Sequence, residues 1–241
     1  MLHSEIGKGV IYLKEVSSTN DYAKKIASEV PEGTVVIAKK QTKGRGRKNR
    51  EWASPEGGLW MSIVLKPQVK REDIPKIVFI GALAVVDTLA EFGIKAGIKW
   101  PNDVWVDNKK ICGILTEGKF GEFAILGIGL NVNNIIPPEL EGSATSMKLL
   151  LGREVGLNEV LETLLRNLSR WYRIFLERGS LAVISAVKEK CFILGKEVKI
   201  IEDGREIRGR AVDIADDGAL VLETPRDKLR ILYGDVSLRL E

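Results

Sequence analysis

The sequence of 241 residues contains a single histidine, His3, and only two cysteines, Cys112 and Cys191. Because His3 lies at the terminus, a Ser-His-Asp triad, a histidine-rich zinc site and a histidine general base are nearly excluded. Two cysteines far apart do not predict a disulfide framework, and we expect both to be small buried hydrophobic side chains. The chemistry must therefore depend on lysine, arginine, carboxylates, amides and backbone groups.

The sequence also lacks any apolar run of about 18 residues that could span a membrane, and its start has no apolar core of a secretory signal. We therefore expect a cytoplasmic protein without membrane contact. Hydrophobic residues make up 44% of the chain and charged residues 29%. This composition is enough for one large domain with a small appendage.

The order of apolar patterns predicts an α+β fold, in which a mixed β-sheet flanked by helices precedes a small β-barrel. From Gly195 on, short alternating strands are broken by Asp-Gly pairs, which is typical of a small all-β barrel. The domain boundary is predicted near residue 188, which gives domains of 1–188 and 189–241. Strands are expected at 9–16, 34–41, 59–65, 94–100, 104–106, 109–117 and 123–132, and helices at about 18–29, 73–93, 157–178 and 181–190.

A basic loop follows the second predicted strand. Residues 39–50 contain seven lysines or arginines and no acidic residue. Two glycines, Gly44 and Gly46, let the backbone turn tightly and approach a ligand. Three guanidinium groups can bind phosphate oxygens and one indole can stack on a flat ring; they belong to Arg45, Arg47, Arg50 and Trp52. The alternatives are a solvated basic loop and a nucleic-acid patch, whereas no P-loop or dinucleotide fingerprint occurs.

Two further segments place polar groups beside apolar strands. In the segment 99–106, Pro101 forces a turn, and Asp103 could bind a metal-bound phosphate or position a basic residue. The alternative is a turn whose polar side chains bond to their own backbone. In strand 109–117, Lys110 and Cys112 are two residues apart and would share one face of a regular strand, which predicts a lysine on the core-facing side. A snorkelling lysine at a sheet edge is the alternative.

The fourth segment, 127–133, places glycines in an apolar strand. Such glycines indicate a ligand or a neighbouring backbone packed close to the strand. Asn131 and Asn133 alternate onto one face and could bond to a base or a sugar. Tight packing without a ligand is the alternative interpretation.

Together and in this order, these segments resemble biotin protein ligases of the type without a DNA-binding domain, the biotin–[acetyl-CoA carboxylase] ligases. The similarity covers essentially the full chain, and the set of motifs is far more specific than any one of them. The first predicted strand starts near Gly9, so no DNA binding is expected. The matching residues are Ser18-Thr19-Asn20, Gly44-Arg45-Gly46-Arg47, Arg50, Trp52, Lys99 to Asp103, Lys110, Gly113, Gly127 to Asn131, and Tyr233 to Ser237, a segment similar to the family's SH3-like C-terminal barrel.

The resemblance implies a catalytic domain that converts biotin and ATP, with Mg²⁺, to biotinyl-5′-AMP and pyrophosphate. Biotin then passes to a lysine of a biotin carboxyl carrier protein. The cations Arg45, Arg47 and Lys110 are the implied catalytic groups, because two anions must be brought together. The implied biotin site comprises Ser18, Thr19, Asn20, Gln41, Gly44, Arg45, Gly46, Arg47, Lys110, Gly113 and Gly127. The implied ATP site comprises Arg47, Arg50, Trp52, Asn102, Asp103, Lys110 and Asn131.

Two rival functions are weighed against this one. A lipoate or octanoate ligase shares the fold and the reaction, but a dithiolane lacks the N–H donors and carbonyl of biotin's ureido ring. Polar groups left unpaired around a dithiolane would cost about 1–3 kcal/mol each, which favours biotin. A nucleic-acid-binding module is disfavoured because residues 189–241 carry 10 basic and 12 acidic side chains and few aromatic ones. Whether the chain forms a homodimer is left open.

Overall fold

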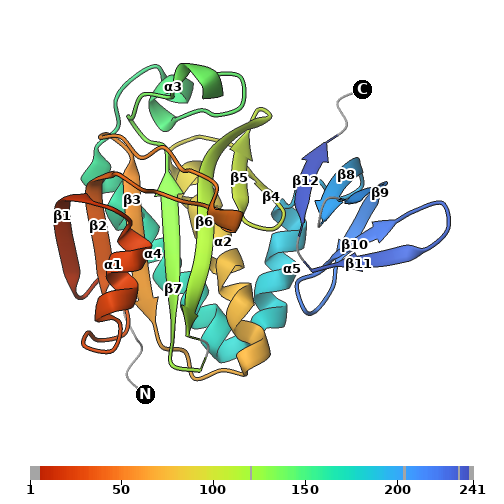
Figure 1. Ribbon diagram of the computed structural model, residues 1–241, viewed down its shortest axis with the longest axis horizontal. Coiled ribbons are helices and arrows are strands. Elements are labelled where there is room, and N and C mark those ends of the chain that lie inside the picture. The colour runs from red at the N-terminus through yellow and green to blue at the C-terminus, as the bar shows by residue number, and fades with distance from the viewer. Residues whose placement is uncertain (1–5, 120, 203–204, 233, 239–241) are drawn as a thin grey trace.

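The largest element is a seven-stranded mixed sheet with the strand order β1-β2-β3-β7-β6-β5-β4 (Figure 1). The computed structural model describes residues 6–119, 121–202, 205–232 and 234–238. Strands β1 and β2 run parallel, and every other neighbouring pair in this sheet is antiparallel. The strands are β1 (Val10–Val16), β2 (Val35–Gln41), β3 (Leu59–Leu65), β4 (Gly97–Lys99), β5 (Asp103–Val106), β6 (Lys109–Lys119) and β7 (Phe123–Leu130).

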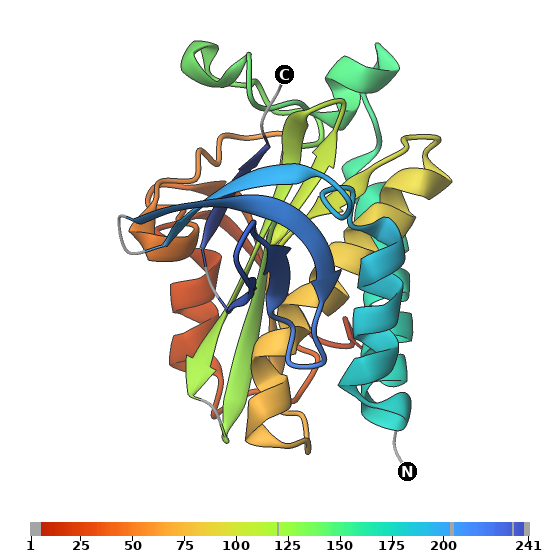
Figure 2. The ribbon, with the colours of Figure 1, turned by 90° about the vertical axis from the view of Figure 1, so that its right-hand side faces the viewer.

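Helices cover both faces of this sheet (Figures 1 and 2). Helix α1 (Thr19–Ile26) lies on one face, while α2 (Ile77–Glu91), α4 (Leu157–Arg178) and α5 (Ser180–Lys190) lie on the other. Helix α2 is apolar nearly all round because the sheet covers one side of it and α4 the other. None of the helices in the described ranges is long and apolar enough to cross a membrane.

A second, antiparallel sheet of five strands forms the C-terminal unit, with the order β11-β10-β9-β8-β12. The indole of Trp100 donates a buried hydrogen bond of 2.9 Å to the carbonyl of Gly218, and one continuous apolar core joins the two units. The boundary predicted near residue 188 falls inside α5, and the second sheet begins only at Glu197. Its strands are β8 (Glu197–Glu202), β9 (Arg205–Ile214), β10 (Leu220–Glu223), β11 (Lys228–Ile231) and β12 (Asp235–Leu238).

The predicted α+β fold is confirmed, and the differences are local. The helix expected from Asp73 starts at Ile77, after a 3₁₀ turn that contains Pro75. The strand expected at 94–100 is reduced to β4, and the short helix α3 (Met147–Leu151) was not predicted. Both cysteines are buried and unpaired, and burial raises the pKa of Cys191 to about 11. The predictions that involve His3 and Tyr233 lie outside the described residues.

The hairpin between β5 and β6 decides where Lys110 points. Asp107 and Asn108 have φ angles of 47° and 62°, as a tight two-residue hairpin turn requires, and both residue types tolerate such angles. The register then shifts, so that Lys110 pairs with Trp105 and the following residue is left as a bulge. The prediction that Lys110 shares a face with Cys112 is therefore wrong, because the bulge reverses the alternation and turns the lysine away from the core.

Candidate active site

A cavity of about 260 Å³ opens on the sheet face that carries α1. The basic loop crosses over it, and the segment 134–144 borders it. Among the residues assigned to the implied catalytic, biotin and ATP sites, only Gly44 does not line this cavity. The lining includes Ser18, Thr19, Asn20, Gln41, Arg45, Gly46, Arg47, Arg50, Trp52, Asn102, Asp103, Lys110, Gly113, Gly127 and Asn131.

The floor of the cavity is made by glycines on two paired strands. Gly113 of β6 lies opposite Gly129 of β7, and Gly127 is two residues before Gly129. A Cβ atom at Gly127 would come within 2.2 Å of the Asn20 Oδ1 atom, and one at Gly129 within 2.4 Å of the Trp52 Nε1 atom. Both side chains can rest against the sheet only because these positions carry no side chain. Gly129 belongs to the segment that matches the family, but it was not assigned to the biotin or ATP site from the sequence.

One end of the cavity is a buried network of neutral polar groups. Ser18 caps α1, which puts Thr19 and Asn20 in the first turn of the helix, facing the sheet. The Gln41 Oε1 atom accepts hydrogen bonds from the backbone N–H of Thr19, at 2.8 Å, and from its hydroxyl, at 3.1 Å. The hydroxyl of Ser62 on β3 lies 2.6 Å from the Asn20 Oδ1 atom and 2.8 Å from the Thr19 Oγ1 atom. These contacts give the polar end a defined set of donors and acceptors.

Arg45 occupies the boundary between this network and the basic loop. It donates two hydrogen bonds to Asp21, at 2.7 and 2.8 Å, and a third to Glu117 at 3.0 Å. The hydrogen bond from Arg45 holds the pKa of the Asp21 carboxyl below its usual value. Arg45 was predicted to neutralise the reacting anions, but here its guanidinium is paired with two carboxylates. The sequence reasoning missed Glu117, which lies four residues after Gly113 on the same strand face.

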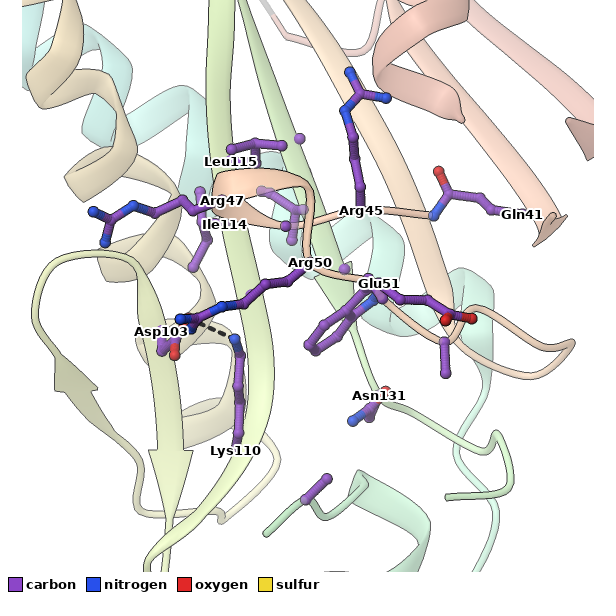
Figure 3. Close-up of a pocket in the computed structure, with 18 of the residues that line it drawn as sticks. Gln41, Arg45, Arg47, Arg50, Glu51, Asp103, Lys110, Ile114, Leu115 and Asn131 are labelled. Atoms are coloured by element: carbon purple, nitrogen blue, oxygen red, sulfur yellow. Dashed lines mark ion pairs between the residues drawn. The ribbon is translucent and has the colours of Figure 1, made fainter. Parts of the chain in front are cut away.

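The other end of the cavity is charged. The Nζ atom of Lys110 lies 2.7 Å from the Asp103 Oδ1 atom and 5.0 Å from the centre of the Trp52 ring. Figure 3 shows Arg50 reaching from the basic loop towards this ion pair, while Arg45 points in another direction. Lysine, carboxylate and arginine therefore converge at one place, as is common where a protein binds a multiply charged anion.

The turn between β4 and β5 is tied to both neighbouring segments. The Asn102 amide donates a hydrogen bond of 2.9 Å to the carbonyl of Ile114. Its oxygen accepts a hydrogen bond of 3.3 Å from Arg47, which also donates to the carbonyl of Gly234 in the C-terminal unit. These bonds place Asp103 beside the cavity, and they show that the turn does not bond only to itself.

Asn131 lines the cavity but bonds to the segment that borders it. Its amide donates to the carbonyl of Thr145 at 3.0 Å, and its oxygen accepts a hydrogen bond from Asn134 at 3.2 Å. Asn133 bonds instead to the backbone of Val155, at 2.7 and 3.0 Å, away from this cavity. Asn131 therefore helps to hold both ends of the segment 134–144 in place. No motif in the sequence indicated that segment, which contributes Ile136, Pro137, Leu140, Ser143 and Ala144 to the lining.

The basic loop is a tight hairpin. Gly46 donates a backbone hydrogen bond of 2.8 Å to the carbonyl of Arg50, and the two residues at the tip, Lys48 and Asn49, have φ angles of 55° and 56°. At the base of the loop, a Cβ atom on Gly44 would lie 2.5 Å from both the hydroxyl of Ser54 and the carbonyl of Trp52. Gly44 therefore allows the two ends of the loop to approach each other behind the cavity wall.

Comparisons with known proteins agree with this geometry. Residues 12–133 match the biotin/lipoate A/B protein ligase family, and residues 193–239 match the biotin protein ligase C terminal domain. The bifunctional ligase/repressor BirA of Bacillus subtilis is 36% identical over 97% of this chain and 75% of the relative. A biotin–[acetyl-CoA-carboxylase] ligase of Paracoccus denitrificans is 32% identical over 93% of this chain and 98% of the relative.

Solved structures lead to the same family. The biotin protein ligase from Aquifex aeolicus, in complex with biotin and ATP, has a TM-score of 0.87 and 36% identity over 96% of this chain and 99% of that chain. The chain therefore belongs to the biotin/lipoate A/B protein ligase family of enzymes. The matching C-terminal domain places it with the biotin protein ligases within that family, which confirms the resemblance seen in the sequence.

The close approach at Gly44 predicts that Gly44→Ala lowers the free energy of unfolding by about 1–3 kcal/mol, since the added methyl group forces the ends of the loop apart. Gly142→Ala is the matched control, because nothing lies within 4 Å of a Cβ atom at that position. Chemical unfolding of both variants tests this. Equal stability of Gly44→Ala and the unmodified chain would contradict a structural role for this glycine.

Proposed function

We propose that the cavity holds biotin at its polar end and ATP at its charged end, and that the chain joins them before transferring biotin to a carrier lysine. A biotin carboxylate oxygen attacks the α-phosphorus of ATP, and the bond to the β-phosphate breaks. The products of this step are biotinyl-5′-AMP and pyrophosphate. The neutral amine of the carrier lysine then attacks the carbonyl carbon of the mixed anhydride, so that an amide forms, AMP leaves and the amine loses a proton.

The observation that carries this proposal is the buried polar network beside a charged cluster, within one cavity. Biotin's ureido ring has two N–H donors and a carbonyl acceptor, which suit hydroxyl and amide partners such as Thr19, Asn20 and Gln41. A dithiolane would leave these groups unpaired. For this reason we favour biotin over lipoate or octanoate, although all three acids could undergo the same activation.

The charged end suits the triphosphate and its base. Trp52 and the apolar groups of the segment 134–144 provide a surface for a flat ring, and Lys110 and Arg50 lie where phosphate oxygens would be bound. Binding would let Lys110 exchange its Asp103 partner for the phosphate at which negative charge develops. Arg47, which is held between Asn102 and the C-terminal unit, would approach the same phosphates as the loop closes.

Magnesium is expected to enter as part of the MgATP substrate. No group of three His, Cys, Asp or Glu side chains in the described part of the chain could hold a metal by itself. Magnesium sites of this type use one or two carboxylates together with substrate phosphates, and Asp103 is a cavity carboxylate that could serve. A biotin carboxyl carrier protein as acceptor and a cytoplasmic location are parts of the same proposal, and a homodimer is compatible with it.

The first prediction is that the purified chain releases pyrophosphate from MgATP when biotin is added and no carrier protein is present. All the groups proposed to handle the reacting anions lie within this one chain, so activation needs no partner. A coupled pyrophosphate assay with biotin, lipoate and octanoate in parallel measures this. Release with lipoate or octanoate but not with biotin would overturn the choice of substrate.

The second prediction is that Lys110→Ala lowers the rate of adenylate formation by about 100-fold or more, as expected when a cation at the developing charge is removed. Lys109→Ala is the matched control, because the neighbouring Lys109 bonds to the carbonyl of Glu141 outside this cavity. Both variants should remain folded by circular dichroism. Near-normal turnover in folded Lys110→Ala would show that the lysine has no part in the reaction.

A further inference from the structure

Glu117 is an acidic residue of β6 that the proposed chemistry does not use. Its side chain is 24% exposed and receives contacts from two residues of helix α1 and from one residue of the basic loop. Its carboxylate accepts hydrogen bonds from Asn20 at 2.8 Å and from Arg45 at 3.0 Å, and it lies 2.9 Å from the Nζ atom of Lys24. Burial raises the pKa of Glu117, but the bonds from Asn20 and Lys24 outweigh it, so that the pKa lies below its usual range. Glu117 is therefore a charged acceptor at neutral pH.

The first consequence is that Glu117 sets the orientation of the Asn20 amide. A carboxylate can only accept, so the Nδ2 atom of Asn20 must face Glu117, and its oxygen must face the other way. That oxygen lies 2.6 Å from the hydroxyl of Ser62. Because an amide oxygen carries no hydrogen, this contact requires the single hydrogen of the Ser62 hydroxyl.

The orientation passes from Ser62 to Thr19. Since Ser62 gives its only hydrogen to Asn20, it cannot also be the donor in its 2.8 Å contact with the Thr19 hydroxyl. The hydrogen of Thr19 has two acceptors within the protein, namely Ser62 and the Gln41 Oε1 atom at 3.1 Å. In either case the Thr19 hydroxyl has no hydrogen left for a ligand, and it can only accept from one.

A flipped Asn20 amide would reverse this order. Its NH₂ group would then donate to Ser62, whose hydrogen would pass to Thr19, and the Thr19 oxygen would lose part of its capacity to accept. A ligand with N–H donors would lose a partner in that arrangement. The charge of Glu117 prevents the flip, because it would place the amide oxygen of Asn20 against a carboxylate.

The same carboxylate also reaches the basic loop. The guanidinium of Arg45 bonds to both Asp21 and Glu117. The start of the loop is therefore tied to β6, whose Glu117 also bonds to Asn20. One half-buried charge thus contacts both the polar end of the cavity and the loop that crosses it.

We propose that Glu117 is a positioning residue that orders the Asn20–Ser62–Thr19 hydrogen bonds so that the site accepts from the N–H groups of biotin, and that it tethers Arg45 of the basic loop to this site. The inference rests on the proposed function, because it assigns N–H donors of biotin to the polar end. Glu117 itself does not need to touch the ligand. It acts through Asn20 and Arg45.

Steady-state kinetics of Glu117→Gln test this proposal. The neutral amide has one oxygen to share among Asn20, Arg45 and Lys24, so the order of the hydrogen bonds is lost. We expect KM for biotin to rise about tenfold, as for loss of a hydrogen bond to a charged partner, while KM for ATP changes less than about twofold. The variant should also discriminate less against a biotin analogue with one methylated ureido nitrogen, which a purely structural role would not change.

Lys24→Gln is the matched control. It removes a partner of the same carboxylate but leaves the bonds to Asn20 and Arg45, so KM for biotin should stay within about twofold of the unmodified value. If Glu117→Gln is too unstable to purify, Asn20→Ala removes the acceptor that holds the Ser62 hydrogen, so that Ser62 can donate to Thr19, and it should give the same rise and the same loss of discrimination.

The outcomes separate this inference from the proposed function. Absence of biotin-dependent pyrophosphate release by the unmodified chain would refute the proposed function. If the unmodified chain is active with biotin, an unchanged KM and unchanged discrimination in folded Glu117→Gln would refute the positioning role alone. A lower melting temperature with unchanged kinetics would show that Glu117 only stabilises the fold.

Discussion

The site depends on the absence of side chains at three positions of two paired strands. Gly113, Gly127 and Gly129 leave the face of β6 and β7 bare, and the bulge after Lys110 turns that lysine onto the same bare face. Asn20 and Trp52 can then lie directly against the sheet at opposite ends of one hollow. A methyl group at either of the last two glycines would displace one of these side chains. The cavity is thus a property of the strand backbone, on which loops and helices place polar groups.

Charge is organised around this hollow before any substrate arrives. The basic loop brings several cations close together, which would repel one another if left alone. Arg45 is paired with Asp21 and Glu117, and Lys110 with Asp103, so each of these two cations has a carboxylate partner. A phosphate group can take the place of one of these carboxylates as the partner of a cation without a large rearrangement. Preorganisation of this kind lowers the cost of stabilising the transition state.

Much of the fold and most of the site could be predicted from the sequence because both follow from local patterns. Strand alternation, the turn at Asp107 and glycines within strands are visible in neighbouring residues. What was missed depends on pairing that residue alternation does not show. The bulge that turns Lys110 arises from its register with β5 across the hairpin, and the pairing of Arg45 with Glu117 joins residues 72 positions apart. The segment 134–144 has no periodic pattern, and it is held by asparagine side chains and by backbone hydrogen bonds to Lys110 rather than as part of a regular strand.

Calorimetric titration of two glycine variants tests most directly whether the bare strand face creates the two ends of the site. Gly127→Ala should displace Asn20 and lower the affinity for biotin by about tenfold or more, while the affinity for ATP stays within about twofold. Gly129→Ala should displace Trp52 and give the opposite pattern. If both variants bind both ligands as the unmodified chain does, or if both lose only the same ligand, the glycine floor does not divide the site in this way.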